Sequence, residues 1–416
     1  MFHCRLLNQT LTATLFVMLT TAVSGCGEEG ITGAGNPDGD VGQDPGESEE
    51  TTGLKRSVLT SIADNVVLPS LARFVGDAQA LEATLQSYAE APDNARLTEA
   101  RNAWRTTLLS WQAVEVMQFG PAGLMESVAG GESIRDEIYS WPLVNRCRVD
   151  QETVEPAHAD PTALAAEAIN VRGLAALEYL LFDSDTGNAC APNSALNTGG
   201  TWDALSAEEI IARRAVYAWS ASRLLTQQAV RLHDFWRPES GDFRAELVNA
   251  GQGSETWPTV QDALQSISDA MFYAEKETKD MKLATPAGLR DCTTATCPEA
   301  LEHPFANTSG DAAMANLQAF GALLNGAPWG EEGTGFMDLL AAAGATELVT
   351  EITVRYDDAV AVLEPLQGTM ESLLVADTAT VVTAHDGVKA LLDLFKTELI
   401  GVLDLDLPQR AEGDND

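Results

Sequence analysis

The chain has 416 residues, of which 45% are hydrophobic and 21% are charged. These fractions are ordinary for globular proteins and exclude disorder along the whole length. The 25 Lys and Arg side chains are outnumbered by 62 Asp and Glu, so the formal net charge at pH 7 is −37. A surface of this charge repels phosphate backbones, which argues against nucleic acid as a partner.

The first 25 residues are typical of an export signal. Their apolar run, Leu11–Leu19, is shorter than the roughly 20 residues that cross a bilayer, and small residues follow it directly before Cys26. This order resembles a bacterial lipobox, so we expect residues 1–25 to be removed and Cys26 to carry lipid. A plain signal peptide cleaved nearby is the alternative.

Residues 26–53 predict a flexible acidic tether, because they combine many glycines and acids with no basic side chain. An acidic tail is expected at residues 409–416. In lipoprotein families, an Asp directly after the lipidated cysteine favours retention at the inner membrane. This chain has Gly27 at that position, so we expect the outer membrane. We therefore expect a protein of the bacterial cell envelope, anchored to a membrane through Cys26 and facing the periplasm or the exterior.

Four cysteines remain in the exported chain once Cys4 and Cys26 are set aside. They can form two disulfides in three ways. We predict Cys292–Cys297, five residues apart in one loop, and Cys147–Cys190. The rival reading is a metal site, but the CxxC spacing that zinc favours is absent.

From Leu54 onward, apolar residues recur at three- and four-residue spacing with almost no strand alternation, which predicts an all-α protein. Pro69 should kink the first helix, and Asp160 should cap the third. Proline and glycine cluster in residues 237–257, so we expect two packed helical bundles, 54–236 and 237–408. The helices are expected over residues 55–89, 95–119, 161–182, 206–236, 258–282, 311–325, 346–375 and 379–400.

One helical segment, residues 170–182, places a carboxylate on an apolar stripe. At 100° per residue, Glu178 falls between Leu174 and Ala175. Such a position is costly unless the carboxylate meets a cation, a metal or several donors. A structural acid paired with a buried arginine is the alternative to a functional site. Gly173 suggests close approach by another backbone or a ligand.

Catalytic motifs are scarce. The sequence contains no HExxH, no Gly-rich phosphate loop and no GxSxG, and none of its five histidines has an acid three residues later. Only His303 lies among acids, near Glu299 and Glu302. We favour a solvated loop position for it over a role as a ligand.

The string from Arg172 to Phe182, RGLAALEYLLF, resembles the signature helix of imelysin-like proteins, whose peptidase members carry GxHxxE. Three further stretches resemble the same family, so that the likeness covers most of residues 55–400: residues 103–121, 138–142 and 282–317. The resemblance implies two packed helical bundles with the motif near their junction. It also implies bacterial envelope proteins, often lipoproteins, that are linked to iron uptake and include some metallopeptidases.

The motif aligns with Gly173, Ala175 and Glu178, so alanine replaces its histidine. A methyl group offers no lone pair to a metal. Glu178 and His303 remain possible metal ligands. The resemblance and the helical wheel together give the candidate ligand-binding residues: Arg135, Trp141, Arg172, Gly173, Glu178, Glu302 and Ser309.

Three functions follow as hypotheses. The first is a non-enzymatic binding lipoprotein associated with iron uptake, which would hold an iron species or another divalent metal at the bundle junction. The second is an imelysin-type metallopeptidase with a substituted metal ligand. The third is a protein-binding scaffold. Iron-transport components of the envelope are the expected partners.

Overall fold

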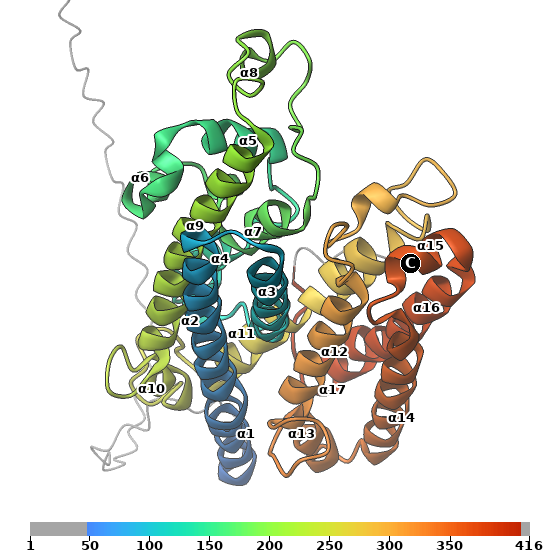
Figure 1. Ribbon diagram of the computed structural model, residues 1–416. Helices are drawn as coiled ribbons and strands as arrows, with labels where there is room; N and C mark the ends of the chain where they lie inside the picture. Colours follow the sequence, from blue (N-terminus) through green and yellow to red (C-terminus); the bar gives the residue numbers. More distant parts are fainter. Residues whose placement is uncertain (1–47, 409–416) are drawn as a thin grey trace, which may run out of the picture. The chain divides into compact units, whose positions relative to one another are not determined.

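The computed structural model describes residues 48–408, which contain helices and no strand (Figure 1). This confirms the all-α prediction. The predicted signal peptide, the lipidation of Cys26, most of the tether and the acidic tail lie outside the described residues.

The first helical run is longer than predicted. It comprises α1 (Glu49–Ser61), the π-helical segment η1 (Ile62–Val67) and α2 (Leu68–Glu90). The tether was expected to reach residue 53, but the Ser48 side chain accepts the Thr51 N–H and begins the helix there. Two glutamates in its first turn favour this start, because they face the positive end of the helix dipole.

The expected kink at Pro69 takes the form of a change in helix type. The segment η1 precedes the proline, and the Leu68 N–H bonds to the Ala63 carbonyl, five residues back. Pro69 lacks an N–H inside a continuous helical run, and the wider hydrogen bonding of η1 directly before it accommodates the proline. By length and composition alone the run Glu49–Glu90 could cross a membrane, but its apolar side chains form part of the core.

The N-terminal half is built around α2, which packs against α3 (Asn94–Glu115) and α9 (Ala207–Trp236). Large aromatic side chains fill the space between these helices; the ring centroids of Phe74 and Trp111, for example, lie 5.2 Å apart. The short helix α7 (Gly173–Phe182) packs on α9 and α3. It is almost wholly buried, and it carries the motif positions.

The predicted helix over residues 161–182 is wrong as a continuous element. The structure has α6 (Pro161–Ala165), a 3-10 turn at Ile169–Val171 (η4) and then α7. Asp160 caps α6 as expected. The break occurs because Gly173 has φ +75° and its backbone presses on the Ile138 carbonyl, which an added Cβ would approach to 2.5 Å. Close approach by another backbone is therefore confirmed, although Gly173 begins the helix.

The C-terminal half begins with α11 (Val260–Met271), which is followed by the π-helical segment η5 (Ala274–Ala284). Helix α12 (Ser309–Asn325) packs on both η5 and α3. The predicted helix 346–375 is interrupted, because Pro365 falls in a 3-10 turn that ends α14. The remaining long elements are α14 (Thr346–Leu363), η7 (Glu364–Leu366), α15 (Met370–Ala376), α16 (Thr378–Leu394), η8 (Phe395–Leu399) and α17 (Ile400–Val402).

Several short elements were not predicted, because a helix of one or two turns shows too little periodicity. They are η2 (Gly120–Ala122), α4 (Ile134–Ile138), α5 (Arg146–Val154), η3 (Pro156–Ala159), α8 (Ala195–Thr198), α10 (Phe243–Val248), η6 (Pro298–Ala300) and α13 (Phe336–Ala342).

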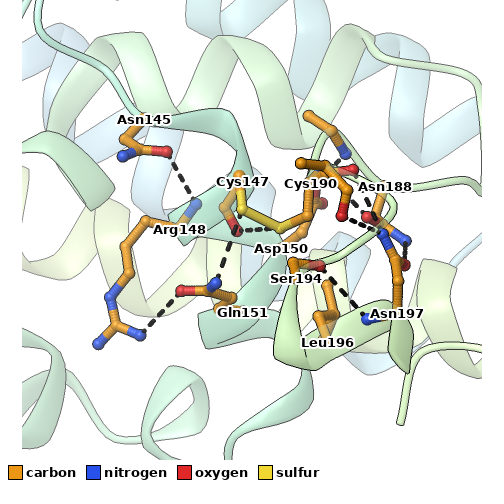
Figure 2. Close-up of a disulfide and its surroundings, with 12 residues drawn as sticks. Asn145, Cys147, Arg148, Asp150, Gln151, Asn188, Cys190, Ser194, Leu196 and Asn197 are labelled. Carbon is orange, nitrogen blue, oxygen red and sulfur yellow. Dashed lines mark hydrogen bonds between the residues drawn. A yellow bond between two sulfur atoms is a disulfide. The ribbon is translucent and has the colours of Figure 1, made fainter. Parts of the chain in front are cut away.

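Both predicted disulfides are present. Cys147–Cys190 ties α5 to the loop after α7, beside the buried carboxylate of Asp150 (Figure 2). Cys292–Cys297 closes a short loop after η5. The first pairing joins residues 43 apart, so it constrains far more chain than the second.

Candidate functional site

Glu178 joins α7 to the segment that precedes α12. Its side chain is buried, and Oε1 accepts the backbone N–H groups of Phe305 and Ala306, each at 3.1 Å. Its Oε2 lies 2.9 Å from Nδ1 of His303. The carboxylate therefore meets both a cation and two donors, which is what its place on an apolar stripe requires.

His303 is fully buried, so the expected solvated loop position is wrong. Its Nε2 lies 3.6 Å from Glu302 Oε1. Burial alone would lower the pKa of His303, but the carboxylates of Glu302 and Glu178 more than offset this and raise it to about 9. The imidazole is therefore charged at neutral pH.

The Glu302 carboxylate is the second anchor of this cluster. Its Oε1 accepts hydrogen bonds from Tyr139 Oη at 2.6 Å and Gln112 Nε2 at 3.0 Å, and forms an ion pair with Lys282 Nζ at 2.9 Å. Burial would raise the pKa of Glu302, but Lys282 and His303 hold it well below its usual range. The carboxylate stays ionised inside the protein.

A polar network continues behind Glu302. Lys282 donates to Gln112 Oε1 at 2.7 Å and to Asn316 Oδ1 at 2.8 Å, and its Nζ lies 3.9 Å from Glu115 Oε2. Arg135 reaches Glu115 Oε1 at 3.1 Å. Burial raises the pKa of Glu115 despite these two cations. The network connects α3, η5 and α12 through the interior.

A pocket of about 710 Å³ opens beside this network. Its wall includes the aromatic side chains of Trp141, Tyr179 and Phe305, and Ala175 and Glu178 of α7. Its other lining residues are Pro142, Val144, Arg146, Met281, Thr285, Asp291, Glu299, Ala300, Leu301, Glu302 and Pro304. Mostly apolar walls with a few charged groups are typical of sites for organic ligands.

Three of the candidate residues, Trp141, Glu178 and Glu302, line this pocket. Arg135 lies behind it, where it also donates to the Trp141 carbonyl at 3.2 Å. The Ser309 hydroxyl accepts the backbone N–H of His303 at 3.1 Å and donates to Glu371 Oε1 at 2.7 Å. It therefore positions the backbone of the histidine.

Arg172 and Gly173 are not among the pocket residues. Arg172 pairs with Glu137 at 2.8 Å and donates to the carbonyls of Leu164 and Ala165. The cation beside Glu178 is thus His303 and not a buried arginine. Gly173 serves backbone packing.

The network also contains five side chains that are not among the candidate ligand-binding residues: Gln112, Glu115, Tyr139, Lys282 and Asn316. All five lie inside the family-like stretches 103–121, 138–142 and 282–317, so those stretches held the available signal. The contacts between them join residues that lie far apart in the sequence, which local pattern does not reveal.

A metal ion does not fit these residues. Among the described residues, no group of three or more His, Cys, Asp or Glu side chains is arranged to hold one. Ala175 contributes a methyl group to the pocket wall, and both oxygens of Glu178 already accept hydrogen bonds. The pocket can instead bind an organic molecule against its aromatic walls, beside the buried charged network.

This fold and site define an imelysin-type protein. The family model described as Imelysin (Peptidase_M75) matches residues 67–397, and the chain belongs to that family. It is 26% identical to iron-regulated protein A of Synechococcus elongatus over 235 residues, which are 56% of this chain and 55% of that protein. The chain thus spans about half the length of this curated relative.

Two solved structures share the fold. An imelysin-like protein from Psychrobacter arcticum superposes with a TM-score of 0.66 at 19% identity, covering 86% of this chain and 98% of the other. A putative iron-regulated protein A precursor from Parabacteroides distasonis superposes with a TM-score of 0.65 at 17% identity, covering 86% of this chain and 96% of the other. At these identities the likeness concerns the fold alone.

Proposed function

We propose that this imelysin-family chain is a non-enzymatic binding protein of the bacterial envelope, associated with iron, that holds an organic iron chelate in the Glu178 pocket. The iron association is supported by the similarity to iron-regulated protein A. The place in the envelope is supported by the lipobox-like Cys26 and by two disulfides, which suit an oxidising compartment.

The observation that supports the proposal most directly is the hydrogen bonding of the Glu178 carboxylate. Both of its oxygens are engaged by His303 and by the N–H groups of Phe305 and Ala306. A bare metal ion would find too few free protein atoms to ligate it here, whereas a chelate supplies the ligating atoms itself. The aromatic walls and the volume of about 710 Å³ suit such a molecule.

The same use of Glu178 argues against peptidase chemistry. A catalytic zinc needs three protein ligands and an open position for water. Ala175 stands where the motif has histidine, and Glu178 is bound to His303. These positions therefore lack a donor set that could activate water.

Fluorescence titration with ferrichrome, a neutral ferric trihydroxamate, tests the binding. Trp141 lies in the pocket wall, so bound chelate should quench its emission. Ala175→Trp would fill the pocket and should weaken binding at least tenfold. Ala80→Trp, at an exposed position of α2, is the matched control and should bind like the wild type.

Absence of saturable quenching in the wild type, or equal affinity in both variants, would overturn the proposal. The metallopeptidase alternative is tested with β-casein in the presence of Zn²⁺. We expect no cleavage; chelator-sensitive cleavage that Glu178→Gln abolishes would favour the alternative.

A further inference from the structure

The loop closed by Cys292–Cys297 forms part of the rim of the pocket. Asp291 precedes the first cysteine, and Glu299 follows the second by two residues; both line the pocket. The chain then continues directly into Leu301 and Glu302, which are buried. The disulfide thus fastens together the two ends of a rim segment that leads into the buried charge cluster.

Apart from the disulfide, this rim is held mainly by backbone and loop-internal contacts, one of which is the Ala295 carbonyl packed against Gly288, where an added Cβ would approach it to 2.1 Å. Within residues 291–296 the side chains are exposed or half-exposed. The Cys297 N–H donates to the Pro286 carbonyl at 2.9 Å, and Arg290 pairs with Asp280 at 2.6 Å. Thr294 donates to the Thr296 carbonyl at 2.6 Å, within the loop itself. A segment with so little buried surface gains conformational freedom readily once its cross-link is cut.

Each disulfide joins one buried cysteine, Cys190 or Cys297, to one half-exposed cysteine, Cys147 or Cys292. The two differ in their surroundings: Cys147 lies in helix α5 and Cys190 packs with Leu196 (Figure 2), whereas the residues on both sides of Cys292 are exposed. A thiol reaches an exposed disulfide more easily than a covered one. Reduction should therefore begin at Cys292–Cys297.

We propose that Cys292–Cys297 is a redox control on the pocket: the disulfide form holds the ligand, and reduction by a dithiol releases it. The inference rests on the proposed function. Affinity falls on reduction because the rim must be ordered again before it can contact the ligand.

A dithiol can reduce Cys292–Cys297 by thiol–disulfide exchange. One thiolate of the reductant attacks the half-exposed Cys292 sulfur, the S–S bond breaks, and Cys297 leaves as a thiolate that takes up a proton. The second thiol of the reductant then displaces Cys292, which also becomes a thiol. Two electrons pass to the protein, and the reductant ends as a disulfide.

The experiment measures ferrichrome affinity by tryptophan quenching before and after limited treatment with dithiothreitol. Alkylation and peptide mass spectrometry identify which pair has been reduced. We expect the Cys292–Cys297 pair to be alkylated first and the dissociation constant to rise at least fivefold. Cys292→Ser/Cys297→Ser should match the reduced protein without reductant and should not respond to it.

Cys147→Ser/Cys190→Ser is the matched control and should keep the full response to dithiothreitol. Equal affinity in the oxidised and reduced protein would overturn the redox control and leave the proposed function standing. Absence of binding in both states would overturn the two together. Reduction of Cys147–Cys190 before Cys292–Cys297 would also contradict the inference.

Discussion

The imidazole of His303 and the carboxylate of Glu178 meet at 2.9 Å, although 125 residues separate them in the sequence. This contact joins α7 to the segment before α12 and fixes one wall of the pocket. It also gives the interior a buried cation, because Glu302 lies 3.6 Å from the other ring nitrogen.

The first prediction concerns pH. The pKa of His303 is raised to about 9 in the folded protein, against about 6.5 when unfolded. Its stabilising contribution is therefore complete below pH 6.5 and is lost as the pH rises through 9. We expect the free energy of unfolding to fall by roughly 3 kcal/mol across this window.

Urea unfolding between pH 6 and 10 measures this change. His303→Gln removes the titrating group, so the variant should lose most of the decline. A wild-type curve that stays flat from pH 6.5 to 9 would mean that the histidine is not charged in the folded state.

The second prediction concerns Glu178 itself. A buried acid is often replaceable by an apolar residue at little cost, but this acid also serves two backbone N–H groups. Glu178→Leu leaves these donors and His303 without their acceptor, and should cost about 3–5 kcal/mol. Glu178→Gln keeps one acceptor oxygen and should cost less.

Thermal and urea unfolding of both variants check the order. Glu99→Leu, at an exposed position on α3, is the control and should change the stability by less than about 0.5 kcal/mol. If Glu178→Leu were as stable as this control, the carboxylate would not hold the two segments together.

The third prediction compares the disulfides. Loop-closure entropy gives Cys147–Cys190 at most about 4 kcal/mol and Cys292–Cys297 about 2 kcal/mol, because the bonded residues are 43 and 5 apart. Paired Cys→Ser variants should lose stability in that order under non-reducing conditions. The reverse order would show that local strain or packing outweighs chain entropy.

The fourth prediction is lipid on Cys26. The short apolar run and the small residues before this cysteine match a lipobox. Mass spectrometry of the mature N-terminal peptide should find an acylated Cys26 as the first residue. An unmodified Cys26, or a mature start elsewhere, would refute lipid anchoring.

The sequence predicted what depends on local pattern. Helical periodicity located most long helices, and the position of Glu178 on an apolar stripe predicted its burial. The family-like stretches also placed Trp141 and Glu302, which line the pocket. Cysteine spacing and the expected export predicted both disulfides.

The sequence could not predict what distant partners decide. The break before α7 depends on the Ile138 carbonyl, which presses on Gly173 from 35 positions earlier. His303 lies among polar neighbours and next to Pro304, so local composition favoured a solvated loop. Its burial comes from Glu178 and from the Trp104 ring, whose centroid lies 5.5 Å from that of the imidazole.

We propose above that an organic iron chelate occupies the pocket beside Glu178. The most direct measurement is an anomalous difference map at the iron absorption edge, from crystals grown with ferrichrome. We predict one peak inside the pocket, near Trp141, Ala175 and Phe305, with the contact between Glu178 and His303 intact. No peak at saturating ferrichrome, a peak elsewhere, or iron coordinated directly by Glu178 would show that the pocket does not hold the chelate in this way.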